Sequence, residues 1–308
     1  MAFLGQLSAK FNEVKTQLPL NSVLDNVNKV RQNVVNNPVF NKCTQQLDSL
    51  GKILQVNVNL KQSPIDLLPL YTAFDPALEN ATFRLDYDET AQCILRNIGQ
   101  CLSIKYPDGA SDDMGLSFLP EEQFHLDTVN LHWGTEPMNG SEHTVGGVGY
   151  AGELHFIHRN LKYTSLEAAS KQPDGIVAFA VFLNESHGDN LNFIPLTNVL
   201  SNVQYNGNES GLSGIKFSAL LPPAEKSKEF WVYEGSETVE PYRETVKWVV
   251  FRSAIPVSSE QLEKLRQLNR TRYEDEVEAK MTPIRPIQAL NGRLARSSFK
   301  SVAQAELP

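Results

Sequence analysis

The sequence predicts a mainly β (α+β) domain preceded by a helical N-terminal arm. Two observations lead to this prediction. From about residue 56 onward, short alternating or apolar runs are separated by turn signals such as Pro107-Asp108-Gly109 and Pro173-Asp174-Gly175. Before that point, apolar residues recur at steps of three and four, the period of a helix face. We expect a helical extension over 1–57, a single domain over 58–302 and a short tail over 303–308.

The predicted arm contains three short helices. The apolar stripe of the first consists of Leu4, Leu7, Phe11, Val14 and Leu18. Pro19 interrupts it, and Ser22 with Asp25 resembles a capping box that opens the second helix. Asn37-Pro38 is a cap and first turn for the third. Such an arm suits a protein partner, an oligomer or a membrane surface, and the alternative is an arm that folds back on its own domain or a weakly ordered tail.

The domain that follows is predicted to be built from strands. Seven of them are expected, at 82–86, 101–106, 127–133, 153–158, 176–182, 230–233 and 246–251. Two helices are expected as well, one over 165–171 and one that begins near Ser258. Ser258 can cap the second helix, and Leu262, Leu265 and Leu268 follow on its apolar face.

Composition narrows the classes of partner. The formal net charge is −8, which argues against nucleic acid and anionic membranes. No apolar run is long enough for a transmembrane segment, and the first ten residues lack the pattern of a secretory signal. The three cysteines, Cys43, Cys93 and Cys101, are scattered, as in reduced proteins. We therefore expect a cytoplasmic protein.

Several motifs resemble those of the α-carbonic anhydrases, in the same order along the chain. They are Gln62-Ser63-Pro64-Ile65-Asp66, Leu131-His132-Trp133-Gly134, Gly140-Ser141-Glu142-His143-Thr144-Val145, Glu153-Leu154-His155 with His158 and Asn160, Ser258-Ser259-Glu260-Gln261-Leu262, Arg285-Pro286 and Ser298-Phe299-Lys300. Together they span roughly four-fifths of the 308 residues. The resemblance implies one α-carbonic-anhydrase-like domain with a central, twisted, mostly antiparallel sheet, peripheral helices and a cone-shaped cavity.

The resemblance also implies a zinc ion held by three histidines, two of them as His-x-His on one strand. Residues at a spacing of two share a strand face, and zinc lowers the pKa of its bound water to about 7. Here the pair reads Asn130 and His132, and the third position is His155. A neutral amide oxygen suits hard cations better than zinc. We expect no cofactor or a weakly bound Zn²⁺, and His132 and His155 as hydrogen-bonded core histidines remain an alternative.

The other histidines are poor replacements for the missing ligand. On a regular strand His125, at an odd offset from Asn130, would face the other way and lie about 16 Å along the strand. His158 is at an odd offset from His155, and the resemblance makes His143 and His158 structural positions. His187 lies in a polar loop.

The resemblance assigns further positions around the metal. Glu153 matches the carboxylate that orients the third ligand, and Thr128 stands where a glutamine would support the first. Gln100 occupies the proton-shuttle position and cannot transfer protons near pH 7. Thr238 and Glu142 match the gatekeeper pair, in which the threonine hydroxyl donates to the glutamate.

Some residues at the positions of the family's pocket wall agree with the α-carbonic anhydrases, and others differ. Ile157, Ile176, Ala178 and Trp248 align with its apolar side. Glu237 replaces an apolar residue, while Val239 replaces a hydroxyl-bearing residue and Glu240 a proline. A carboxylate at 237 would repel bicarbonate and admit water, or reach into the cavity as a new ligand.

These departures predict a carbonic-anhydrase-related protein that is catalytically silent or strongly impaired. Such a protein would be a binding or scaffold module with an unknown protein partner, and the arm is the candidate surface. The alternative is a weak zinc-dependent carbonate dehydratase that hydrates CO₂ to bicarbonate. A third interpretation is an assembly protein in which the arm drives oligomerisation.

Overall fold

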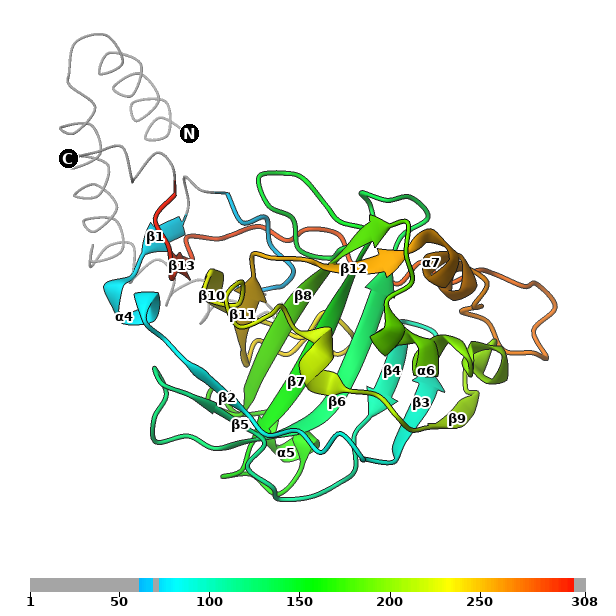
Figure 1. The fold of residues 1–308 in the computed structure, drawn as a ribbon, viewed down its shortest axis with the longest axis horizontal. Helices are drawn as coiled ribbons and strands as arrows, with labels where there is room; N and C mark the ends of the chain where they lie inside the picture. Colours follow the sequence, from blue (N-terminus) through cyan, green and yellow to red (C-terminus); the bar gives the residue numbers. More distant parts are fainter. Residues whose placement is uncertain (1–60, 69–71, 302–308) are drawn as a thin grey trace, which may run out of the picture. The chain divides into compact units, whose positions relative to one another are not determined.

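The computed structural model describes residues 61–68 and 72–301 (Figure 1). The predicted arm over 1–57 and the tail over 303–308 lie outside the described residues, and the domain boundaries remain predictions. Within the described part, no helix is long and apolar enough to cross a membrane.

The described residues form mainly strands. They are β1 (Thr72–Phe74), β2 (Phe83–Leu85), β3 (Cys93–Asn97), β4 (Leu102–Lys105), β5 (Met114–Leu116), β6 (Phe124–Trp133), β7 (Gly152–Asn160), β8 (Ile176–Ser186), β9 (Glu209–Leu212), β10 (Phe230–Gly235), β11 (Val246–Phe251), β12 (Ile255–Ser258) and β13 (Ala295–Ser297). Each of the seven predicted strands overlaps one of these. The strands that the sequence patterns missed are short ones of three to five residues.

The helices that connect or follow these strands are short. They are α4 (Pro76–Glu79), α5 (Leu166–Ala169), α6 (Ile194–Thr197) and α7 (Ser259–Arg266), with 3₁₀ turns η3 (Leu191–Phe193), η4 (Leu200–Val203) and η5 (Phe217–Leu220). Both predicted helices are present. Ser165 caps α5, and Ser258 and Gln261 form a reciprocal capping box at the start of α7.

One mixed sheet contains all the strands, and most neighbouring pairs are antiparallel, as predicted. The main path is β1-β13-β10-β11-β8-β7-β6-β4-β3-β9, and β8, β7 and β6 run side by side through its centre (Figure 1). The parallel pairs are β8 with β11, β8 with β12 and β1 with β13. β8 is buried on both faces along most of its length, which explains its nearly continuous apolar sequence.

The sheet separates two apolar cores. Along β8, Val177, Phe179, Val181 and Leu183 pack into the larger core. The intervening Ile176, Ala178, Ala180 and Phe182 pack into a smaller core that also contains Trp248. This alternation fixes which side chains of β6 and β7 face the smaller core, because paired residues on neighbouring strands share a face.

A β-bulge in β6 corrects one expectation. The register with β7 shifts between Leu126 and Thr128, so Asp127 is an extra residue. His125 therefore pairs with Arg159, which lies four residues from His155 on β7 and shares its face. The prediction that His125 faces away from Asn130 is wrong, because the strand is not regular.

His125 is nevertheless fixed by its neighbours. It is buried, and its Nδ1 lies 2.7 Å from Asp113 Oδ2. Its Nε2 lies 3.1 Å from the Pro107 carbonyl oxygen, which can only accept a hydrogen bond. With one nitrogen on a carboxylate and the other donating to a carbonyl, the ring has no nitrogen left for a metal.

The His125–Asp113 pair should make stability depend on pH. Burial opposes protonation of His125, but Asp113 outweighs it and raises the pKa of the imidazole. The stability from the charged form is fully present below the unfolded pKa of about 6.5 and is lost as the pH rises through the raised folded value. His125→Gln should lower the free energy of unfolding, measured by denaturant titration. We expect this loss to be smaller at about pH 9 than at about pH 6, by on the order of 1 kcal/mol.

His158→Gln is the matched control. Burial lowers the pKa of His158 to about 3, so the ring is neutral throughout this pH range. Its contacts are with the Tyr87 hydroxyl and the Val177 carbonyl. The cost of this substitution should stay constant with pH. An equally constant cost for His125→Gln would show that His125 is not charged in the folded protein.

Candidate metal centre

The pairing of β6 with β7 brings the three predicted ligand positions together. Asn130 is opposite His155, and His132 is opposite Glu153. The ring centroids of His132 and His155 are 4.5 Å apart. All four side chains lie on the face of the sheet that carries the smaller core.

His132 is held as a neutral imidazole. Its Nδ1 is 2.7 Å from the Pro283 carbonyl oxygen and must donate the proton of that hydrogen bond. The lone pair therefore belongs to Nε2, which is buried and has no hydrogen-bond partner among the described residues. Burial lowers the pKa of the ring to about 3. This is the protonation state that a metal ligand requires.

His155 is oriented from the other side. Its Nε2 is 2.7 Å from Glu153 Oε1, where the predicted orienting carboxylate was expected. His143 and His155 keep the pKa of Glu153 well below its usual range despite burial, so the carboxylate accepts this proton. The Nδ1 of His155 is then the acceptor, and the nearest hydroxyl, Thr238 Oγ1, is 3.4 Å away.

A buried hydrogen-bond chain supports Glu153. His143 reaches Glu153 through its backbone N–H at 2.8 Å and its Nδ1 at 2.5 Å. The Nε2 of His143 is 2.6 Å from the Tyr233 hydroxyl, which is 2.8 Å from Ser63 Oγ. With its polar atoms satisfied in this way, His143 is a structural residue that fixes the orientation of His155.

Glu142 is buried beside both imidazoles. Its Oε1 accepts a hydrogen bond of 2.8 Å from the Arg285 backbone N–H. The same Oε1 lies 3.5 Å from His132 Nδ1, and Oε2 lies 3.7 Å from His155 Nδ1. Burial raises the pKa of this carboxyl to about 7, against the opposing influence of His155 and of the Thr238 hydroxyl.

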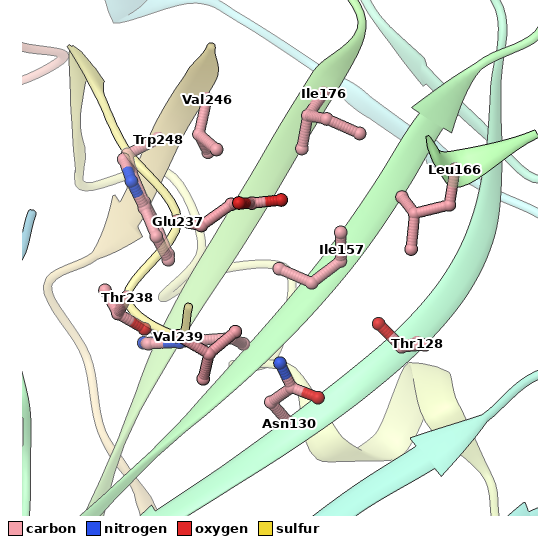
Figure 2. Close-up of a pocket in the computed structure, with 11 residues that line it drawn as sticks. Thr128, Asn130, Ile157, Leu166, Ile176, Glu237, Thr238, Val239, Val246 and Trp248 are labelled. Carbon is pink, nitrogen blue, oxygen red and sulfur yellow. Dashed lines mark hydrogen bonds between the residues drawn. The ribbon is translucent and has the colours of Figure 1, made fainter. Parts of the chain in front are cut away.

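A small cavity opens above these residues (Figure 2). Its volume is about 90 Å³, room for several water-sized molecules. The lining consists of Thr128, Asn130, His155, Ile157, Leu166, Ile176, Glu237, Thr238, Val239, Val246 and Trp248.

Most of the predicted pocket residues line this cavity, but Ala178 does not. Ala178 is fully buried in the core beneath the wall. Leu166 and Val246 were missed. Val246 is two residues from Trp248 on β11, so strand periodicity could have found it. No pattern in the sequence singles out Leu166, which comes from the one-turn helix α5.

Glu237 forms an ion pair with Arg243. Its Oε1 is 2.8 Å from Arg243 Nη1, and its Oε2 accepts a 3.2 Å hydrogen bond from the Arg243 backbone N–H. Figure 2 shows its carboxylate directed towards Ile176 and away from Asn130. The geometry therefore does not favour Glu237 as a replacement ligand. The arginine also offsets the negative charge that was expected to repel bicarbonate, and it lies only six residues further along the same loop.

Gln100 and Thr128 have different surroundings. Gln100 is exposed, does not line the cavity, and accepts a hydrogen bond of 3.2 Å from the Glu240 backbone N–H. Thr128 is on β6, two residues before Asn130, and contributes to the cavity wall.

The Glu237–Arg243 pair should be energetically coupled. Their side chains are only 21% and 31% exposed, and removing one partner leaves a partly buried charge. We expect a coupling energy of about 1 kcal/mol from a double-mutant cycle of Glu237→Gln and Arg243→Gln, measured as free energies of unfolding.

The Glu229–Arg252 pair provides the control. It has the same 2.8 Å separation, but both side chains are 48% exposed. The same cycle should give about 0.3 kcal/mol or less there. Equal coupling energies for the two pairs would mean that burial of the Glu237–Arg243 contact has no energetic consequence.

Comparisons with known proteins agree with this geometry. The family model for eukaryotic-type carbonic anhydrases matches residues 51–299. Carbonic anhydrase 3 of Homo sapiens is 32% identical over 239 residues, which is 78% of this chain and 90% of that protein. Carbonic anhydrase 3 of Equus caballus is 34% identical over the same shares. Carbonic anhydrase 7 of Homo sapiens is 31% identical over 242 residues, 78% of this chain and 89% of that protein.

Proposed function

The chain belongs to the family of eukaryotic-type carbonic anhydrases, and on that premise we propose that it is a related member whose hydratase activity is absent or strongly impaired. We propose further that it serves as a binding or scaffold module. The observation that carries the proposal is Asn130, an amide directly opposite His155 where an imidazole ligand is needed.

The residues present fit a zinc ion only in part. His132 and His155 lie on one face of the sheet; His132 Nε2 has no hydrogen-bond partner among the described residues, and His155 Nδ1 has only the Thr238 hydroxyl at 3.4 Å. Bound zinc would supply an acidified water. Asn130 can offer only a neutral amide, which is a poor zinc ligand. Loss of one imidazole therefore lowers both the affinity for zinc and the number of strong ligands that hold it.

Two features outside the ligand set support the same proposal. The side chain of Gln100 is tied to the backbone of Glu240, and a carboxamide cannot carry a proton near neutral pH. Val239 lines the cavity with an apolar side chain. A weak carbonate dehydratase is the alternative, favoured by the orientation of both imidazoles and by the retained Thr238. It would require a further ligand to complete the metal shell.

The partner in this proposal is a protein bound through the predicted arm over 1–57. A cytoplasmic location is proposed on composition, and it is consistent with Cys93 and Cys101, which are free and buried. Size-exclusion chromatography of the full chain and of a variant without the arm separates the possibilities. An oligomer that dissociates when the arm is removed would assign the arm to self-assembly instead.

Asn130→His should restore the missing imidazole. With zinc supplied, we expect no CO₂ hydration above the buffer rate for the unaltered protein and a measurable rate for the variant. Its zinc affinity should rise roughly 100-fold or more, since even supporting residues around a metal change affinity by about 10–100-fold. Stopped-flow hydration assays and zinc titration measure the two quantities.

Asn184→His is the control, because Asn184 is exposed on β8 and does not line the cavity. It should change neither the rate nor the affinity at the site. A clear hydration rate in the unaltered, zinc-supplied protein would overturn the proposed loss of activity.

A further inference from the structure

We propose that the cavity above β6 and β7 binds a small neutral molecule with an amide-like polar end and a short apolar end, and that Asn130 recognises the polar end without a metal. The inference rests on the proposed function, and it names the class of ligand that the binding module takes in this cavity. A buried amide without a partner and the character of the walls around it carry the argument.

Asn130 is a buried amide that faces the cavity. The residue is 9% exposed and is part of the cavity lining. Its side chain makes no hydrogen bond to any other residue in the described ranges 61–68 and 72–301. Buried polar groups are nearly always hydrogen-bonded, because a buried amide without a partner is destabilising. A molecule in the cavity can supply the missing partner.

Thr128 adds a second polar group on the same side of the cavity. It is two residues before Asn130 on β6, and residues at this spacing share a strand face. Its hydroxyl also has no hydrogen-bond partner among the residues that the structure describes. Figure 2 shows both side chains projecting from β6 towards the space that Ile157 and Leu166 line. The amide and the hydroxyl together offer donors and acceptors along one strip of the wall.

Most of the remaining lining is apolar. The apolar side chains that line the cavity are Ile157, Leu166, Ile176, Val239, Val246 and Trp248. Burial of an apolar group against them is favourable, whereas a wholly polar ligand would lose its hydration there without replacement. The walls therefore favour a ligand that has a short apolar end beside its polar end.

The charges around the cavity favour a neutral ligand. Glu237 supplies a carboxylate to the lining, and Arg243 already pairs with it at 2.8 Å. An anion would be repelled by this carboxylate, and a cation would have to compete with Arg243 for it. Either ion would also lose hydration against apolar walls, which is costly. A neutral molecule avoids these costs.

Another amide is the natural complement of Asn130. A carboxamide has two N–H donors and a carbonyl acceptor, so an amide ligand can donate to the Asn130 oxygen and accept from its nitrogen at the same time. The cavity volume of about 90 Å³ limits the ligand to a few non-hydrogen atoms. Isobutyramide, a branched apolar group with a primary amide, combines the required features in a molecule of this kind.

The test measures binding of isobutyramide to the metal-free full chain by NMR titration. Isobutyrate and isobutylamine serve as an anion and a cation of similar shape. We expect saturable binding of isobutyramide with a dissociation constant of about 1 mM, and binding of both ions that is weaker by about tenfold or more. Isobutyramide that does not bind, or that binds no more tightly than either ion, would overturn the proposal and leave water as the partner of Asn130.

Two substitutions locate the ligand. Asn130→Ala should weaken isobutyramide binding about tenfold, because it removes the hydrogen bonds to the ligand amide. Leu166→Trp, on the one-turn helix α5, should weaken binding about tenfold or more by filling the apolar end of the cavity. An unchanged affinity in Asn130→Ala would show that this amide does not recognise the ligand, and an unchanged affinity in Leu166→Trp would place the ligand outside the cavity. Either result would overturn the proposal.

Asn184→Ala is the matched control. Asn184 is exposed on β8 and does not line the cavity, so its loss should leave the affinity for isobutyramide unchanged. A loss as large as that of Asn130→Ala would show that any lost amide has this effect and would overturn the assignment. Because the titrations are made without metal, they are read separately from the zinc-supplied hydration assay. Hydration by the unaltered protein would overturn the proposed function, whereas absent isobutyramide binding would overturn the ligand class alone.

Discussion

The register between β6 and β7 is the constraint on which the candidate site depends. It places Asn130 opposite His155 and His132 opposite Glu153, with all four on one face. Because side chains alternate along a strand, a slip of one residue would turn them into the larger core. That slip is opposed by Val129, Leu131 and Phe156, which are fully buried on the other face. Packing of the larger core therefore holds the polar face of the same two strands in position.

The carboxylates around the two paired strands β6 and β7 have different roles. Glu153 is ionised and fully hydrogen-bonded, so it orients His155 and cannot also bind an ion. Glu237 is paired with Arg243 on the cavity wall. Glu142 is buried beside both imidazoles, and its Oε1 accepts a hydrogen bond from the Arg285 backbone N–H. The fold of the carbonic anhydrase family is thus retained around these groups.

The sequence was informative where periodicity or ordered motifs carried the signal. The long strands and the cap of α7 could be predicted, and the motifs around His132 and His155 lie on the two strands that the structure pairs. The bulge at Asp127 could not be predicted, because one extra residue leaves the apolar pattern of β6 readable as a regular strand. The hydrogen bond from His132 to the Pro283 carbonyl, which fixes the tautomer of the imidazole, joins residues 151 positions apart in the sequence. The ion pair between Glu237 and Arg243 depends on how their loop folds. Neither contact could be predicted from the sequence. Such contacts follow from side-chain geometry in three dimensions, not from local pattern. The arm and the domain boundaries stay predictions.

Anomalous diffraction at the zinc absorption edge, from crystals of the full chain and of Asn130→His grown at the same Zn²⁺ concentration, tests the central claim most directly. That claim is that Asn130, in place of an imidazole, weakens the metal site built on His132 and His155. The predicted result is a strong anomalous peak bonded to three imidazoles in the variant, and a much weaker peak or none at this position in the unaltered protein. Peaks of equal strength in the two proteins would contradict the claim.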